Sequence, residues 1–147
     1  MTNASRRLAA TVDHFLAEWH GRGWARAFHS LIELGPTALP LLVERFDEER
    51  DAALRAEIVA LADQMQTPSA LGLYERALQD GEPAVWKAAL DALVALHTPE
   101  AVALLERAQA EAPEPRTPED YAVWVAEAVQ QARAALEPPG DQEEDPV

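Results

Sequence analysis

The phrase TPEAVALLERA at residues 98–108 is nearly a copy of TPSALGLYERA at residues 67–77, which begins 31 residues earlier. A fainter copy, GPTALPLLVERF, occupies residues 35–46. A period of this length is typical of repeat proteins, in which each unit buries its apolar face against the next unit. The repeated phrase therefore predicts an array of stacked units.

Four segments share the apolar spacing i, i+4, i+7, i+8, which is the buried stripe of an amphipathic helix. Between them lie partner segments with an apolar face of their own, at residues 6–20, 37–46, 68–79 and 99–110. Together these segments predict an all-α fold of eight helices in about four antiparallel hairpins. The four sets are Trp24, Phe28, Leu31, Ile32; Leu54, Ile58, Leu61, Ala62; Trp86, Leu90, Leu93, Val94; and Tyr121, Val125, Ala128, Val129.

Proline and threonine mark where several of these helices are expected to begin. Thr67-Pro68 and Thr98-Pro99 each place a capping hydroxyl before a proline at the first helical position, where the missing N–H costs nothing. Thr117-Pro118 is expected to open the second helix of the last hairpin in the same way. Pro40 is tolerated only in a first turn, so its helix should begin near Thr37.

The composition favours one folded domain with an acidic tail. The 147 residues are 48% hydrophobic and include only 6 glycines, as expected for a helical chain with a core. We expect a single domain over residues 1–136, followed by a disordered acidic tail, EPPGDQEEDPV, at residues 137–147. The lack of cysteine excludes disulfides and suits a reducing compartment. Because no signal peptide and no apolar run of membrane-spanning length is present, a cytoplasmic location is expected.

The net charge of −14 indicates what kind of partner the chain would attract. It opposes binding to nucleic acid, because lysine and arginine must neutralise phosphates there. It favours a basic protein partner through electrostatic steering and complementarity. The charge is uneven, since residues 1–26 carry four arginines against two acids.

The unit TPSALGLYERALQDGEPAVWKAALDALVAL, residues 67–96, resembles a HEAT repeat, in particular the short type of the phycobilin-lyase-like HEAT group. The resemblance implies a right-handed α-solenoid of stacked helix pairs. It does not imply lyase chemistry, because such repeats support many unrelated functions and this chain has no cysteine. Trp86 departs from the group, standing where arginine is common, whereas the earlier unit keeps Arg55. The matching residues are Asp80, Pro83, Val85, Ala88, Ala89 and Leu93.

In HEAT-like solenoids the second helices line the concave surface, so the resemblance places a group of polar residues on the ligand-facing side. The alternative is that these are ordinary solvated charges, paired along a helix as Lys87 and Asp91 would be at i, i+4. Trp124 lies one residue off the apolar stripe and is the expected exposed aromatic anchor, whereas the other three tryptophans are expected in the core. The predicted partner-binding residues are Arg26, Arg55, Glu57, Lys87, Asp91, Trp124 and Glu127.

No motif in the sequence indicates catalysis. The histidines lack the i, i+4 spacing of a helical zinc pair, and the sequence has no G-x-S-x-G elbow and no glycine-rich phosphate loop. Carboxylates are plentiful, but those in polar turns stay solvated and ionised. We therefore expect no catalytic residue, no metal site, no cofactor and no enzymatic activity.

These observations favour a non-enzymatic protein–protein interaction module, a monomer or weak dimer, that binds a basic protein and neither nucleic acid nor membrane. One specific form of this hypothesis is an immunity or inhibitor protein that neutralises a basic toxin. An alternative is a scaffold, assembly or chaperone subunit that oligomerises through the apolar faces of its end helices. A HEAT-like nucleic-acid glycosylase is a remote alternative, which the overall charge opposes.

Overall fold

The chain folds as a succession of helices. The computed structural model describes residues 3–18, 21 and 23–137, and these contain no strand. The all-α prediction is confirmed. The helices are α1 (Asn3–Ala17), α2 (Trp24–Leu34), α3 (Leu39–Glu48), α4 (Ala52–Met65), α5 (Leu71–Leu78), α6 (Pro83–Leu96), α7 (Pro99–Glu111) and α8 (Tyr121–Leu136), with the short 3-10 helices η1 (Gly35–Ala38) and η2 (Pro68–Ala70).

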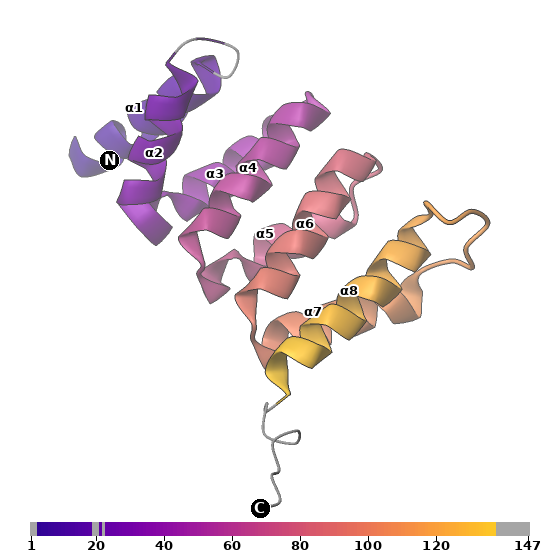
Figure 1. Cartoon of the computed structure of the whole chain (residues 1–147). Coiled ribbons are helices and arrows are strands. Elements are labelled where there is room, and N and C mark those ends of the chain that lie inside the picture. Colours follow the sequence, from indigo (N-terminus) through magenta and orange to yellow (C-terminus); the bar gives the residue numbers. More distant parts are fainter. Residues whose placement is uncertain (1–2, 19–20, 22, 138–147) are drawn as a thin grey trace, which may run out of the picture.

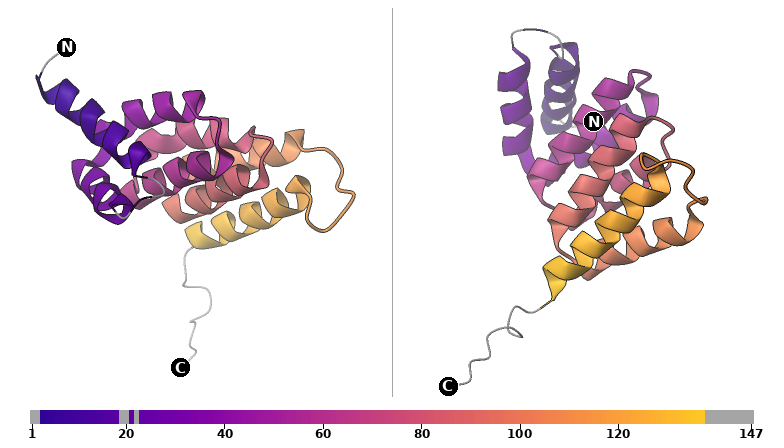
Figure 2. Two further views of the ribbon diagram at one scale, coloured as in Figure 1. Left: turned by 90° about the horizontal axis from the view of Figure 1, so that it is seen from above. Right: turned by 45° about the vertical axis from the view of Figure 1, so that its right-hand side comes forward.

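The helices form two layers (Figures 1 and 2). Figure 1 shows α2, α4, α6 and α8 in front, stepping along the molecule, with α1, α3, α5 and α7 behind them. We call the front helices the second layer, because each is the second helix of its hairpin, and the others the first layer. Within the second layer α6 packs against both α4 and α8, and it also packs against α5 of its own hairpin. The α-solenoid prediction is confirmed.

The core lies between the two layers, and the predicted apolar stripe points into it. Leu31, Leu61, Leu93 and Val125, one from each helix of the second layer, are fully buried. Each belongs to the apolar stripe of its own helix, whose members share one face because residues three and four apart lie on the same side of a helix. The spacing of apolar residues in the sequence therefore identifies the buried face correctly.

One of the predicted repeat alignments is wrong by one residue. Burial along α6 follows burial along α4 at a spacing of 31 residues, so Val85 takes the place of Leu54. Trp86 consequently stands in the place of Arg55 and not in that of Leu54. The apolar spacing alone does not resolve this, because Val85 and Trp86 are both apolar and either residue fits a stripe that begins there. The HEAT-repeat resemblance had already placed Trp86 where the earlier unit has Arg55.

The threonine caps are confirmed at two helix starts. The side-chain oxygen of Thr67 accepts the N–H of Ser69 at 3.2 Å, and that of Thr98 accepts the N–H of Ala101 at 3.1 Å. Pro40 lies in the first turn of α3, as its missing N–H requires. These local signals were sufficient because a cap depends only on residues that are neighbours in sequence.

Two predicted helix boundaries are wrong. Thr117-Pro118 does not open α8, which begins at Tyr121, because the Asp120 carboxylate accepts the Thr117 N–H at 3.0 Å and holds these residues in a turn. The first helix ends at Ala17, before residue 20, and the Glu18 carboxylate accepts the Gly23 N–H at 3.0 Å. The predictions for Trp19, for the Trp24 side chain and for the tail beyond residue 137 lie outside the described part of the chain.

Candidate functional site

One arginine on each of α3, α5 and α7 pairs with a carboxylate of the preceding unit. The Glu-Arg step in each repeated phrase places one arginine on α3, α5 and α7, and each arginine reaches back about one repeat. Exposed pairs of this kind contribute roughly 0–1 kcal/mol each, but they cancel charge along this layer. These ion pairs were not predicted, although their signal, a Glu-Arg step every 31 residues, is present in the sequence. The pairs are Arg45–Asp13 (2.6 Å), Arg76–Asp47 (2.6 Å), Arg107–Glu75 (3.0 Å) and, from α8, Arg133–Glu106 (2.7 Å).

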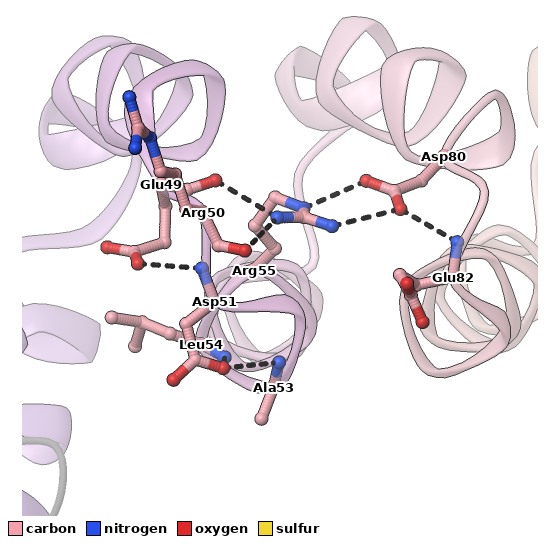
Figure 3. Close-up of polar contacts among 8 residues, drawn as sticks. All are labelled: Glu49, Arg50, Asp51, Ala53, Leu54, Arg55, Asp80 and Glu82. Carbon is pink, nitrogen blue, oxygen red and sulfur yellow. Dashed lines mark hydrogen bonds and ion pairs between the residues drawn. The ribbon is translucent and has the colours of Figure 1, made fainter.

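Arg55 is held in a dense network between two turns (Figure 3). Its guanidinium donates to both carboxylate oxygens of Asp80, at 2.9 and 3.2 Å, and to the carbonyls of Glu49 and Arg50 at 3.0 and 2.9 Å. Asp80 also accepts the N–H of Glu82 at 2.9 Å. Both ends of the ion pair are largely buried, with 15% and 12% of the two side chains exposed. The network joins the α3–α4 turn to the α5–α6 turn.

This network determines the charge states of its members. Burial by itself would raise the pKa of Asp80, but the hydrogen bonds from Arg55 and from the Glu82 N–H outweigh it and hold the pKa below its usual value. Arg55 was predicted to contact a partner, and the structure instead places its guanidinium in contacts within the chain. These contacts connect one repeat to the next.

The carboxylates on the exposed side of the second layer have a different environment. Glu57 and Asp63 lie on α4, Asp91 on α6 and Glu127 on α8, and none of them forms an ion pair with a described residue. Burial raises the pKa of Glu57, and burial together with the charge of Asp91 raises the pKa of Asp63. We call the surface formed by these four carboxylates and Trp124 the second-layer face. Asp63 is its one carboxylate that sequence analysis did not select.

Asp91 and Glu127 occupy the same place in successive repeats. Each is exposed and is followed directly by two buried residues, Ala92 and Leu93 in one helix and Ala128 and Val129 in the other. Because α6 and α8 pack side by side, this equivalence places the two carboxylates on the same side of adjacent helices. A row of negative charge therefore crosses the α6–α8 junction.

The environment of Glu57 yields a stability prediction. Replacing Glu57 with glutamine is expected to raise the free energy of unfolding at neutral pH, because it removes a partly desolvated charge without an ion pair among the described residues. The folded-state pKa is raised above its usual value of 4.5, so the native protein gains stability as the pH falls through that raised pKa. The advantage of Glu57→Gln should therefore shrink toward pH 4.5 and vanish below it. Urea unfolding at several pH values measures this difference in the free energy of unfolding. An equal gain from Glu44→Gln, at an exposed position on α3, would contradict the prediction.

An aromatic cluster joins α6 to α8. Trp86 is buried, and its ring meets those of Tyr121 and Trp124 edge to face, at 5.1 and 6.3 Å between centroids. Trp124 is 38% exposed, which confirms the prediction that it is partly exposed. The ammonium of Lys87 lies 4.3 Å from the centre of the Trp124 ring, in a cation–π contact. The alternative pairing of Lys87 with Asp91 is not among the ion pairs of the described residues, so Lys87 leaves that carboxylate without a cation.

A small cleft opens beside this cluster, between α6 and α8. Its volume is about 90 Å³, well below the roughly 300–1,000 Å³ of sites for drug-sized ligands. Its lining combines apolar side chains with two of the unpaired carboxylates. The lining residues are Leu90, Asp91, Val94, Trp124, Glu127, Ala128 and Gln131.

The structure thus gathers four of the seven predicted binding residues and separates the rest. Lys87, Asp91, Trp124 and Glu127 meet at the α6–α8 junction, while Glu57 lies on neighbouring α4. Arg26 is exposed on α2 at the other end of the solenoid, where it lines a separate cleft with His14 of α1. Sequence spacing could not distinguish these groups, because it does not report which helices lie side by side.

The described residues contain no group of three or more His, Cys, Asp or Glu side chains placed to hold a metal ion. In the same part of the chain no helix has the length and apolar character needed to cross a membrane.

A family model for HEAT repeats matches residues 39–119, which is more than half of the chain. The matched segment runs from the start of α3 to the turn before α8. The predicted phycobilin-lyase-like subtype is not confirmed by this match. No curated protein and no solved structure matches the chain.

Proposed function

Because the chain belongs to the HEAT-repeat family, we propose that it is a protein-binding module whose second-layer face holds a basic segment of a partner protein. HEAT repeats generally mediate protein–protein interaction. The observation that supports the choice of face is the distribution of charge. The arginines of α3, α5 and α7 are paired within the chain, whereas Glu57, Asp63, Asp91 and Glu127 have no cation among the described residues.

A basic partner supplies what these carboxylates lack. Glu57 and Asp63 are partly removed from water and Asp91 and Glu127 are exposed, but none of the four has a counter-ion among the described residues, so each favours the approach of a cation. The net charge of −14 also steers basic proteins toward the chain from a distance. The same charges repel phosphate backbones, which opposes the nucleic-acid alternative. In its specific form the proposal is an immunity or inhibitor protein that masks a basic toxin in the cytoplasm.

The proposal predicts a capture that depends on three carboxylates. The immobilised full-length chain is exposed to a lysate of its source cells, and retained proteins are identified by mass spectrometry. We expect the unaltered chain to retain a basic protein, and we expect salt to release that protein because screening weakens charge contacts. The variant Glu57→Gln/Asp91→Asn/Glu127→Gln should not retain it. The control Glu44→Gln/Glu114→Gln/Glu119→Gln changes the net charge equally at exposed positions outside the second-layer face and should retain it.

Two results would contradict this proposal. One is retention of the same proteins by both variants, and the other is retention that salt does not weaken. The toxin form has its own test, in which the captured protein is produced in host cells with and without this chain. Relief of toxicity by the unaltered chain, and not by the second-layer variant, is the expected result.

A scaffold that assembles through its ends is the second candidate, and one observation favours it. Leu34 of α2 and Leu136 of α8, on the two end helices of the second layer, are 39% and 40% exposed. End-to-end contact between copies would cover both side chains. Light scattering over a range of concentrations distinguishes the candidates, because a scaffold increases in mass with concentration, whereas the proposed binder keeps the mass of one chain.

A further inference from the structure

The cleft between α6 and α8 differs from the rest of the second-layer face, because there an exposed indole and two carboxylates converge. Building on the proposed protein-binding function, we propose that this cleft receives an arginine side chain of the partner, which packs against Trp124 and pairs with Asp91 and Glu127. The partner is thereby specified as a protein that presents arginine in an exposed segment.

The size and lining of the cleft fit one long side chain. Its volume of about 90 Å³ leaves no room for a small-molecule ligand of ordinary size. Leu90, Val94 and Ala128 provide the apolar surface that an aliphatic stem covers when its charged end stays at the rim. The carboxylates that would meet the charged end are equivalent in successive repeats and lie on the same side of adjacent helices.

The indole is already arranged to meet a cation. Trp86 holds the Trp124 ring edge to face, and the Lys87 ammonium lies 4.3 Å from the centre of that ring. Lys87 covers part of the ring, but Trp124 is still 38% exposed and lines the cleft, so ring surface remains for a guanidinium that enters there. Lys87 is not among the residues that line the cleft, so an arginine entering the cleft meets Asp91 and Glu127 there.

Arginine fits these groups better than lysine does. Its guanidinium is flat, so it packs on an aromatic ring, and its fork of N–H donors matches carboxylate oxygens. It is also more weakly hydrated than an ammonium group, so less hydration is lost on entering a partly apolar cleft. A lysine of the partner could satisfy one carboxylate as a point charge, but it would gain less from the indole.

The test uses the full chain labelled with ¹⁵N and capped peptides with three copies of Gly-Ser-Arg or of Gly-Ser-Lys. The indole N–H signals of the four tryptophans are observed by NMR, and the signal of Trp124 is assigned with Trp124→Phe. We expect the arginine peptide to shift the Trp124 signal and to bind about two- to fivefold more tightly than the lysine peptide, which is the range of an exposed cation–π contact.

Two variants locate the effect. Trp124→Ala should weaken binding of the arginine peptide about two- to fivefold and abolish the preference over lysine. Asp91→Asn/Glu127→Gln should weaken it more than the control Glu44→Gln/Glu114→Gln, which removes the same charge from exposed positions outside the cleft. Far-UV circular dichroism of each variant verifies that the helices remain folded.

Equal binding of the two peptides, or an unmoved Trp124 signal, would overturn the arginine assignment. The assignment would also be overturned if Asp91→Asn/Glu127→Gln bound the arginine peptide as tightly as Glu44→Gln/Glu114→Gln does. Failure here is distinguishable from failure of the proposed function. If the unaltered chain still captures a basic protein and the second-layer variant does not, the proposed binding function is supported and only the assignment of the cleft is wrong.

Discussion

Replacing Leu93 with alanine is expected to lower the free energy of unfolding by about 3 kcal/mol, within the roughly 2–5 kcal/mol typical of a buried leucine. Leu93 is fully buried on α6. That helix packs against α4, α5, α7 and α8, so a cavity there loosens three hairpins together. Because each unit of a repeat protein is stabilised only by its neighbours, the central unit has the largest effect on the whole chain.

The matched control is Leu34→Ala, since Leu34 is the same residue type but is 39% exposed on α2. It should change the free energy of unfolding by less than about 0.5 kcal/mol. Urea unfolding followed by both circular dichroism and tryptophan fluorescence measures the two variants and shows whether the repeats unfold together. A similar cost for both variants would mean that the core does not lie where the two layers place it.

Replacing Arg55 with methionine is expected to lower the free energy of unfolding by about 2 kcal/mol. The substitution keeps the apolar stem but removes four hydrogen bonds, two of them to the Asp80 carboxylate. A single hydrogen bond to a charged group is worth roughly 1.5–3 kcal/mol. Asp80 is then left largely buried without its cation. Lysine at this position should not restore stability, because a point charge cannot reproduce the forked geometry.

A double-mutant cycle with Asp80→Asn separates the pair from its surroundings. We expect a coupling of about 1–2 kcal/mol for Arg55–Asp80 and below about 0.5 kcal/mol for Arg107–Glu75, because the latter side chains are 57% and 51% exposed. Comparable couplings in the two cycles would show that burial does not set the strength of these pairs.

The Arg55–Asp80 coupling should also depend on pH. The pKa of Asp80 lies below its usual value of 3.8, so its contribution is complete above that value and is lost as the pH falls through the folded-state pKa. Acid therefore weakens this junction between repeats. The change is opposite in sign to that at Glu57, whose raised pKa makes the native state gain stability as the pH falls.

These opposite pKa shifts separate two roles for charge in this molecule. At Asp80 the charge is compensated within the chain and stabilises the fold, whereas at Glu57 and Asp63 it is partly desolvated and reduces stability. Charges that cost stability and have no partner among the described residues are a common mark of a binding surface. A variant that gains stability but loses the captured protein would connect the two properties directly.

The sequence predicted the helices and the core well because both depend on local spacing. Leu61 and Leu93 could be assigned to the core because residues three and four apart share a helix face. Thr67 and Thr98 could be assigned as caps because a cap involves only its near neighbours. Thr117 failed as a cap because its own N–H and its hydroxyl both donate to the Asp120 carboxylate, which holds it in a turn, a choice that the dipeptide pattern does not encode.

The candidate site could be predicted only in part, since its chemistry depends on which helices are neighbours. The partial exposure of Trp124 was correctly predicted from its offset from the stripe, but its contact with Lys87 joins residues on two separate hairpins. Asp63 was not selected, because its proximity to Asp91 arises only when α4 lies beside α6. Arg55 was placed with the binding residues because spacing alone does not reveal a carboxylate 25 residues away.

The sequence by itself determined that this chain is a repeat of helical hairpins with a continuous core, because the spacing of apolar residues along each helix decides which of them are buried. Only the tertiary structure decided which charges are paired and which remain available. The reason is that an ion pair requires two groups within a few ångströms, and stacking brings Arg55 to Asp80 while leaving Asp91 and Glu127 with no cation among the described residues.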